Sequence, residues 1–215
     1  GTIEFESSDT NNNGTKAFIT AHTETAAAQT SLVFGTATSG QANAQARMTI
    51  NSDGDAGIGT SAPAGKLHIM SGDAGTVTPS SQADDLVVES STEGGITIMT
   101  PDNQSARIRF TSPSTESGDE GGADIFYRQN INKMSIGTIV SGGILAFDSG
   151  ANVETMVLKA GNVGIGTDDP SELLHLSSTG PARLLIEADT DNITETDNAQ
   201  IILKQDGGFV VGNLG

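Results

Sequence analysis

Two histidines are the residues with the greatest potential for metal chemistry. His68 and His175 occupy the same place in two similar segments, Leu-His-Ile and Leu-His-Leu. Under threefold symmetry, either histidine would present three imidazoles to one metal ion. Each lies between two apolar residues, so on a strand its side chain would point away from theirs. If those apolar residues pack on a symmetry axis, His68 and His175 face water, and we expect no bound metal. His22, alone in a polar stretch, is a weaker candidate.

Two glycine-rich segments suggest phosphate binding at first sight. Gly57-Ile58-Gly59-Thr60 lacks the Gly-Lys-Ser/Thr that follows in a phosphate-binding loop, and Gly164-Ile165-Gly166-Thr167 runs into two aspartates that would repel phosphate. The segments therefore predict structural bends, and we expect no nucleotide or other cofactor.

Acidic residues could support glycoside hydrolysis if two of them faced each other across a sugar-binding cleft. The candidate pairs are adjacent in sequence, and adjacent strand residues point to opposite faces. The chain also has no Trp and one Tyr, and it lacks a Gly-x-Ser-x-Gly motif. Two oxygen-rich segments lack the spacing of a calcium-binding loop and predict turns. We expect no enzyme activity. The pairs are Asp84/Asp85, Asp119/Glu120 and Asp168/Asp169, and the oxygen-rich segments are residues 51–55 and 189–192.

The composition excludes several classes of partner. The 215 residues carry a formal net charge of −17, and the basic residues are scattered from Lys16 to Lys204. This spacing predicts no positive stripe, so we expect no binding of nucleic acid. No apolar run approaches the length needed to span a bilayer, so membrane insertion is not expected either. The absence of cysteine removes disulfides and thiolate chemistry. Because residue 1 is Gly, we expect the chain to be a segment of a longer protein.

Large core residues are scarce. Leu, Ile, Val and Phe make up about a fifth of the chain, while Gly, Ser and Thr are abundant. The free energy gained by burying these side chains falls well short of the free-energy cost of the conformational entropy lost when a chain of this length becomes ordered. We therefore expect further burial between chains.

The secondary-structure elements that position these candidate residues are predicted to be β-strands. Apolar and polar residues alternate with period two in segments such as residues 48–50, 67–69, 108–110 and 174–176, and clusters of Asn, Asp, Ser and Gly separate them. The only segment of helical composition, around residues 25–29, has no apolar stripe. This pattern predicts an all-β, elongated repeat protein with short strands.

An internal repeat organises the chain. The segment from Gly54 to Ile69 recurs from Gly161 to Leu176 at a constant offset of 107 residues, with one extra residue after Met48 in the first copy. We predict a truncated first repeat over 1–83, a complete repeat over 84–181, and the start of a third over 182–215. Upstream and downstream matches are Ile3/Ile108, Phe5/Phe110, Phe18/Phe126, Phe34/Phe147, and residues 86–89 with 184–187.

The segment Gly161-Asn162-Val163-Gly164-Ile165-Gly166-Thr167-Asp168-Asp169-Pro170, with the Leu-His-Leu that follows, resembles a G-N-V-G-I-G-T-x-x-P repeat of bacteriophage tail fibres and related virion appendages. The resemblance covers most of the chain and implies an intertwined parallel homotrimer in the virion. In this trimer, Gly57, Gly59, Gly164 and Gly166 would let three backbones approach the axis, with Ile58 and Ile165 filling it.

The function that the resemblance implies is mechanical. The segment would form a shaft that holds a distal receptor-binding tip, with copies of itself and other fibre or baseplate proteins as partners, and it would contact the host surface indirectly. Two alternatives are direct recognition of the host surface through exposed loops such as 111–122, and a tailspike that degrades polysaccharide.

Overall fold

The computed structural model describes residues 1–7, 14–23, 29–38, 40–41, 43–76, 78–112, 121–150, 153–187 and 201. As predicted, the described part is all-β: fourteen strands and one short 3₁₀ helix (Gln129–Ile131) are assigned in it, with no α-helix. It divides into two units, Gly1–Thr97 and Ile98–Gly215. The segment of helical composition around residues 25–29 falls largely outside the described residues.

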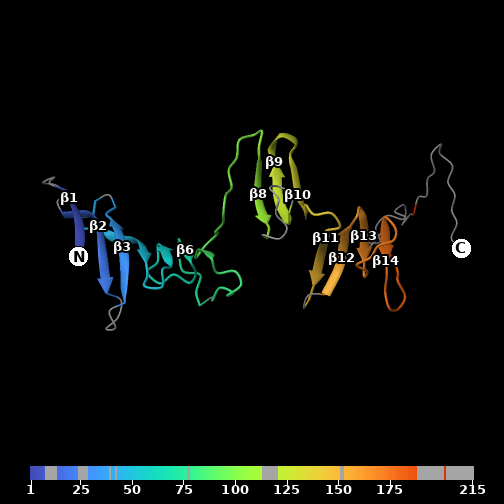
Figure 1. Cartoon of the computed structure of the whole chain (residues 1–215), viewed down its shortest axis with the longest axis horizontal. Helices are drawn as coiled ribbons and strands as arrows, with labels where there is room; N and C mark the ends of the chain where they lie inside the picture. Colours follow the sequence, from blue (N-terminus) through green and yellow to red (C-terminus); the bar gives the residue numbers. More distant parts are fainter. Residues whose placement is uncertain are drawn as a thin grey trace, which may run out of the picture. The chain divides into compact units, whose positions relative to one another are not determined.

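The first unit is built around one seven-stranded sheet whose strands neighbour each other in chain order (Figure 1). The first five strands pair antiparallel, and the last two join them in parallel. β7 therefore completes the first sheet, although it opens the predicted second repeat. The strands are β1 (Thr2–Ser7), β2 (Gly14–Thr23), β3 (Thr30–Thr36), β4 (Gln45–Ile50), β5 (Ala56–Ile58), β6 (Leu67–Met70) and β7 (Leu86–Glu89).

The second unit contains two separate sheets. One is an antiparallel meander of β8 (Ser105–Phe110), β9 (Ala123–Arg128) and β10 (Lys133–Thr138). The other contains β11 (Ile144–Ser149), β12 (Val153–Lys159), β13 (Asn162–Ile165) and β14 (Leu174–Leu176), with the last pair parallel. Residues 182–187, which begin the predicted third repeat, carry no strand, and most of that repeat lies outside the described residues.

The internal repeat appears in the structure as a repeated strand register. Ile58 pairs with Met48 and Ile69 in the first unit, and Ile165 pairs with Met156 and Leu176 in the second. Phe34 and Phe147 hold equivalent places, each directly before a bulge. The match of Phe18 with Phe126 is wrong, because the pairings Ile3–Ile19 and Ile108–Ile125 align Phe18 with Asp124.

The extra residue of the first copy is taken up in a turn. β12 and β13 are joined by the two-residue turn Ala160-Gly161, and both of these residues have positive φ angles, 53° and 89°. The equivalent turn between β4 and β5 has three residues, with Gly54 at φ 80°. Because two- and three-residue hairpin loops both preserve pairing of the flanking strands, the register after the turn is the same in both copies.

Candidate association surface

One face of the seven-stranded sheet carries an uninterrupted row of apolar side chains. Cross-strand pairing places one such residue on every strand, in direct register with the next. Adjacent side chains in a row of this kind are close enough to pack against one another. The row is Ile3, Ile19, Phe34, Met48, Ile58, Ile69 and Val88, and a second row on the same face is Leu32, Ile50, Ala56, Leu67 and Leu86.

The sheet of β11–β14 repeats both rows. Phe147, Met156, Ile165 and Leu176 correspond to the first row, and Leu145, Leu158, Val163 and Leu174 to the second. We call these two rows, together with those of the first sheet, the apolar faces. The three-stranded sheet also has an apolar row, formed by Ile108, Ile125 and Ile136.

The apolar faces are open to solvent in the single chain. Ile58 is 42% exposed, Ile165 40% and Ile3 61%. Within the described residues, Val157 is the only hydrophobic side chain that is fully buried, and it lies on the opposite face of its sheet. Large contiguous apolar patches on a protein surface mark sites of association. The shortage of core residues inferred from composition thus has a structural counterpart: most apolar residues of the first sheet lie on one face, where several are exposed, although Phe18, Val33 and Val87 lie on the other face.

The predicted motif residues divide between the two faces of each sheet. Ile58 and Ile165 lie on the apolar faces, as the axial prediction requires. Gly57 and Gly164 lie on the opposite face, paired with His68 and His175, and both glycines are buried.

Contacts within the chain explain why glycine occupies these positions. A Cβ at Gly57 or Gly164 would overlap the carbonyl oxygen of Thr60 or Thr167, and one at Gly59 or Gly166 would overlap that of Met70 or Ser177. Gly59 and Gly166 also have positive φ angles, 82° and 73°, which favour glycine. Within the single chain, the backbones that approach these glycines belong to the chain itself, and the approach of symmetry-related chains stays a prediction.

His68 lies on the face opposite Ile58, as the alternation predicts, but it does not face water. Its side chain is buried, with the residue 3% exposed. Its Nδ1 atom accepts a hydrogen bond from the backbone N–H of Ala64 at 3.2 Å, and its Nε2 atom lies 2.9 Å from Glu89 Oε2. His175 repeats the first contact, with the N–H of Ser171 at 3.4 Å. The expectation of solvent exposure is wrong for His68 because loops cover this face.

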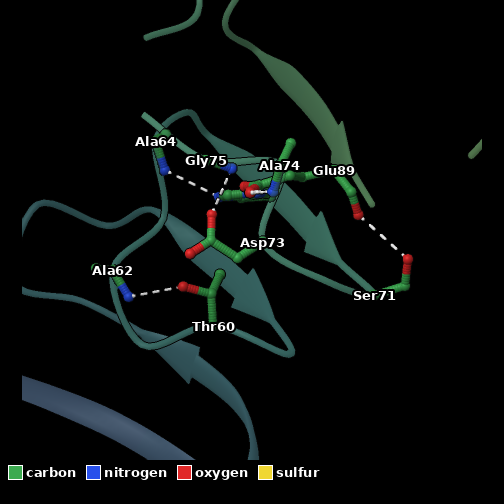
Figure 2. A network of polar contacts seen from close by, with 9 residues as sticks. Thr60, Ala62, Ala64, Ser71, Asp73, Ala74, Gly75 and Glu89 are labelled. Atoms are coloured by element: carbon green, nitrogen blue, oxygen red, sulfur yellow. Dashed lines mark hydrogen bonds and ion pairs between the residues drawn. The ribbon is translucent and has the colours of Figure 1, made fainter. Parts of the chain in front are cut away.

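Glu89 connects this histidine to the loop that covers it. Its Oε1 atom accepts the backbone N–H of Ala74 at 2.7 Å, and its backbone oxygen accepts bonds from Ser71 (Figure 2). Asp73 in the same loop caps the N–H of Gly75 at 2.7 Å. The network joins β6, β7 and their connection, which is a structural role. No group of three or more potential metal ligands occurs among the described residues.

The other acidic candidates within the described residues form contacts of turns and strand ends. Asn51 Oδ1 accepts the backbone N–H groups of Asp53 and Asp55, so the oxygen-rich segment is a hydrogen-bonded turn. Asp84 and Asp85 offer their backbone oxygens to the start of β6, and Asp169 forms an ion pair with Lys159. The Asp119/Glu120 pair, the 189–192 segment and most of the 111–122 loop lie outside the described residues.

The basic residues are less scattered than the sequence suggested. Four of the ten lie on one face of the three-stranded sheet, opposite the row of Ile108, Ile125 and Ile136: Arg107, Arg109, Arg128 and Lys133. Sequence reasoning missed this group because the strand register, which was unknown, brings three strands together. The Arg-Ile-Arg alternation at residues 107–109 was the available signal.

No helix in the described part of the chain is long and apolar enough to cross a membrane. A scan against family models and a search of the curated proteins find no match to this chain.

Proposed function

We propose that this chain is a structural segment that assembles with copies of itself through its apolar faces. The observation that carries the proposal is the apolar row that crosses all seven strands of the first sheet and recurs in the sheet of β11–β14. Packing these faces against other copies would supply the core that the single chain lacks. Copies of the same chain are the simplest partners for the apolar faces, because the repeated register gives each chain two matching faces.

The number of copies and the biological setting follow from the resemblance to virion appendage repeats. We propose a parallel homotrimer that forms part of the shaft of a viral tail fibre or spike and positions a receptor-binding tip. Other fibre or baseplate proteins would be its further partners. The high acidity of the chain supports this role, because assembled rods with a large net negative charge repel each other and stay dispersed.

The size of the assembly in solution tests the proposal directly. Light scattering combined with size-exclusion chromatography should give three times the chain mass, and electron microscopy should show elongated particles. A stable, folded monomer would contradict the proposal.

A single substitution tests whether the apolar face is the contact. Ile3 is 61% exposed, so Ile3→Glu removes little packing from the isolated chain but places a charge in the proposed interface. We expect this variant to dissociate at concentrations at which the wild type is assembled. The matched control is Thr2→Glu, which adds the same charge on the opposite face of the same strand and should leave assembly intact.

A further inference from the structure

The sheet of β11–β14 ends at a strand whose counterpart in the first sheet has one more neighbour. β6 pairs on its outer side with the parallel strand β7, where the backbone N–H of Leu67 donates to the carbonyl oxygen of Asp85 at 2.9 Å. β14 corresponds to β6 in the repeat, but it is the last strand of its sheet, and no strand of the described residues pairs with its outer edge. An open strand edge presents backbone groups that another strand can pair with. The edge of β14 is therefore a site for strand addition.

The sequence that fills the equivalent position in the first sheet is repeated after β14. Residues 184–187 (Leu-Leu-Ile-Glu) match the residues of β7 (Leu-Val-Val-Glu). Placed on β14 in the register of β7 on β6, Leu184 would pair with Leu174, and Ile186 with Leu176. These two side chains would extend the two apolar rows of their sheet by one residue each, as β7 does in the first sheet. The match therefore defines both the segment that fits the edge and its register.

In the single chain this segment does not occupy the edge. Residues 184–187 carry no strand, and Leu184, Leu185 and Ile186 are 64%, 80% and 41% exposed. Seven residues, 177–183, lie between β14 and the segment, whereas fifteen, 71–85, lie between β6 and β7. The shorter connection also contains Pro181, which restricts the backbone. Short and restricted connections favour exchange of a strand between copies over pairing within one chain.

We propose that residues 184–187 of one copy add to the outer edge of β14 in a neighbouring copy, as a fifth strand parallel to it. The inference rests on the proposed function, because only copies that run in the same direction present the segment parallel to β14. Backbone hydrogen bonds give strand addition of this kind its affinity, and the alternating side chains give it specificity. The exchanged strand would tie neighbouring copies together where one repeat ends and the next begins.

The exchanged strand would complete the sheet without rebuilding the surroundings of His68. In the first sheet, Ala74 in the fifteen-residue connection donates its backbone N–H to Glu89, which lies next to the buried His68. The connection that follows β14 is eight residues shorter, so it offers less chain to cover His175.

Engineered disulfides test which chain supplies the strand, because the protein has no cysteine of its own. Leu174→Cys and Leu184→Cys place thiols on paired residues, whose Cα atoms would lie about 4.8 Å apart, a separation that a disulfide spans. Chains with both substitutions, after mild oxidation, should run at multiples of the chain mass on denaturing electrophoresis without reductant. Links within single chains, or no links in an assembled sample, would overturn the proposal.

Two further samples sharpen the cross-linking result. Chains that carry only Leu174→Cys, refolded together with chains that carry only Leu184→Cys, can form this link only between copies, and we expect them to form it. Leu174→Cys combined with Leu185→Cys is the matched control, because the side chain of residue 185 would point to the opposite face of the sheet. This control should form far fewer links, and equal linking would refute the register.

Hydrogen exchange of the unmodified chain decides the question if the cysteine variants fail to assemble. In the assembled protein, the amides of residues 184–187 should exchange at least about tenfold more slowly than those of an unstructured segment. Unprotected amides would refute the proposal. Light scattering of the same samples separates this proposal from the proposed function: normal assembly without links between copies refutes strand exchange alone, whereas a wild-type chain that stays monomeric refutes both.

Discussion

The Nε2 atom of His68 lies 2.9 Å from Oε2 of Glu89, on the buried side of the sheet, whereas His175 is only half-buried. The residue that matches Glu89 in the repeat, Glu187, is exposed and lies outside any strand. Two histidines at the same position of the repeat therefore have different surroundings.

This difference predicts unequal effects of the same substitution. His68→Ala leaves the backbone N–H of Ala64 without its partner and opens a buried space, so we expect the free energy of unfolding to fall by about 1–3 kcal/mol. His175→Ala should lower the free energy of unfolding by clearly less and should leave assembly intact. Urea unfolding of both variants measures the difference, and equal losses would contradict this account of His68.

The positions of the same two histidines also bear on whether the protein binds a metal ion. His68 lies on the face opposite Ile58, so packing the apolar faces on an axis would keep His68 away from that axis. We expect protein purified without a His tag to contain no stoichiometric transition metal by elemental analysis. One tightly bound metal ion per three chains would overturn this prediction.

Strand alternation and the repeat were readable from the sequence because both depend on local residue order. The apolar rows follow from the alternation once the register is known, and the repeated register is itself a consequence of the repeated sequence. The positions of Phe126 and of the four basic residues could not be predicted, since a shift of a few residues in pairing changes which side chains are neighbours. The burial of His68 depends on the loop between β6 and β7, whose path no periodicity encodes.

The turn between β12 and β13 predicts a stabilising substitution. Ala160 has a φ angle of 53°, a conformation that costs an ordinary residue about 1 kcal/mol or more relative to glycine or asparagine. Ala160→Asn would create the Asn-Gly pair that two-residue turns of this kind prefer. We expect the free energy of unfolding to rise by about 0.5–1 kcal/mol. Gly161→Ala, at φ 89°, serves as the opposite control and should destabilise the protein.

The ion pair of Lys159 with Asp169 predicts a local pH response. A hydrogen bond from Lys159 and its positive charge hold the pKa of Asp169 below the usual value of 3.8. Any stability from this pair is present above the pKa of the unfolded state and is lost as the pH falls through the lower, folded-state pKa. Because Asp169 is exposed, the effect on stability should be small. In Lys159→Ala, an NMR titration should show the pKa of Asp169 returning towards 3.8.

Folding and association should be inseparable if the apolar faces pack against other copies. The midpoint of thermal unfolding should then rise with chain concentration, as for obligate oligomers. Circular dichroism at concentrations spanning a hundredfold range measures this dependence. A midpoint that does not change with concentration would show that the single chain is stable with its apolar faces uncovered.

Ile165→Asp should be the most damaging single change in the second glycine motif. Ile165 lies on the apolar face between Met156 and Leu176, so the substitution places a carboxylate among apolar side chains and, in a threefold assembly, three carboxylates near one another. Burying an unpaired charge costs several kcal/mol, in addition to about 2 kcal/mol for the lost apolar side chain. Because Ile165 is 40% exposed in the single chain, most of this cost should arise when the chains pack together, and with folding coupled to association it should lower both. Asp168→Ala, three residues later in the polar turn, should be mild. Light scattering and urea unfolding of both variants decide the question, since an Ile165→Asp protein that assembles like the wild type would rule out the apolar face as the contact.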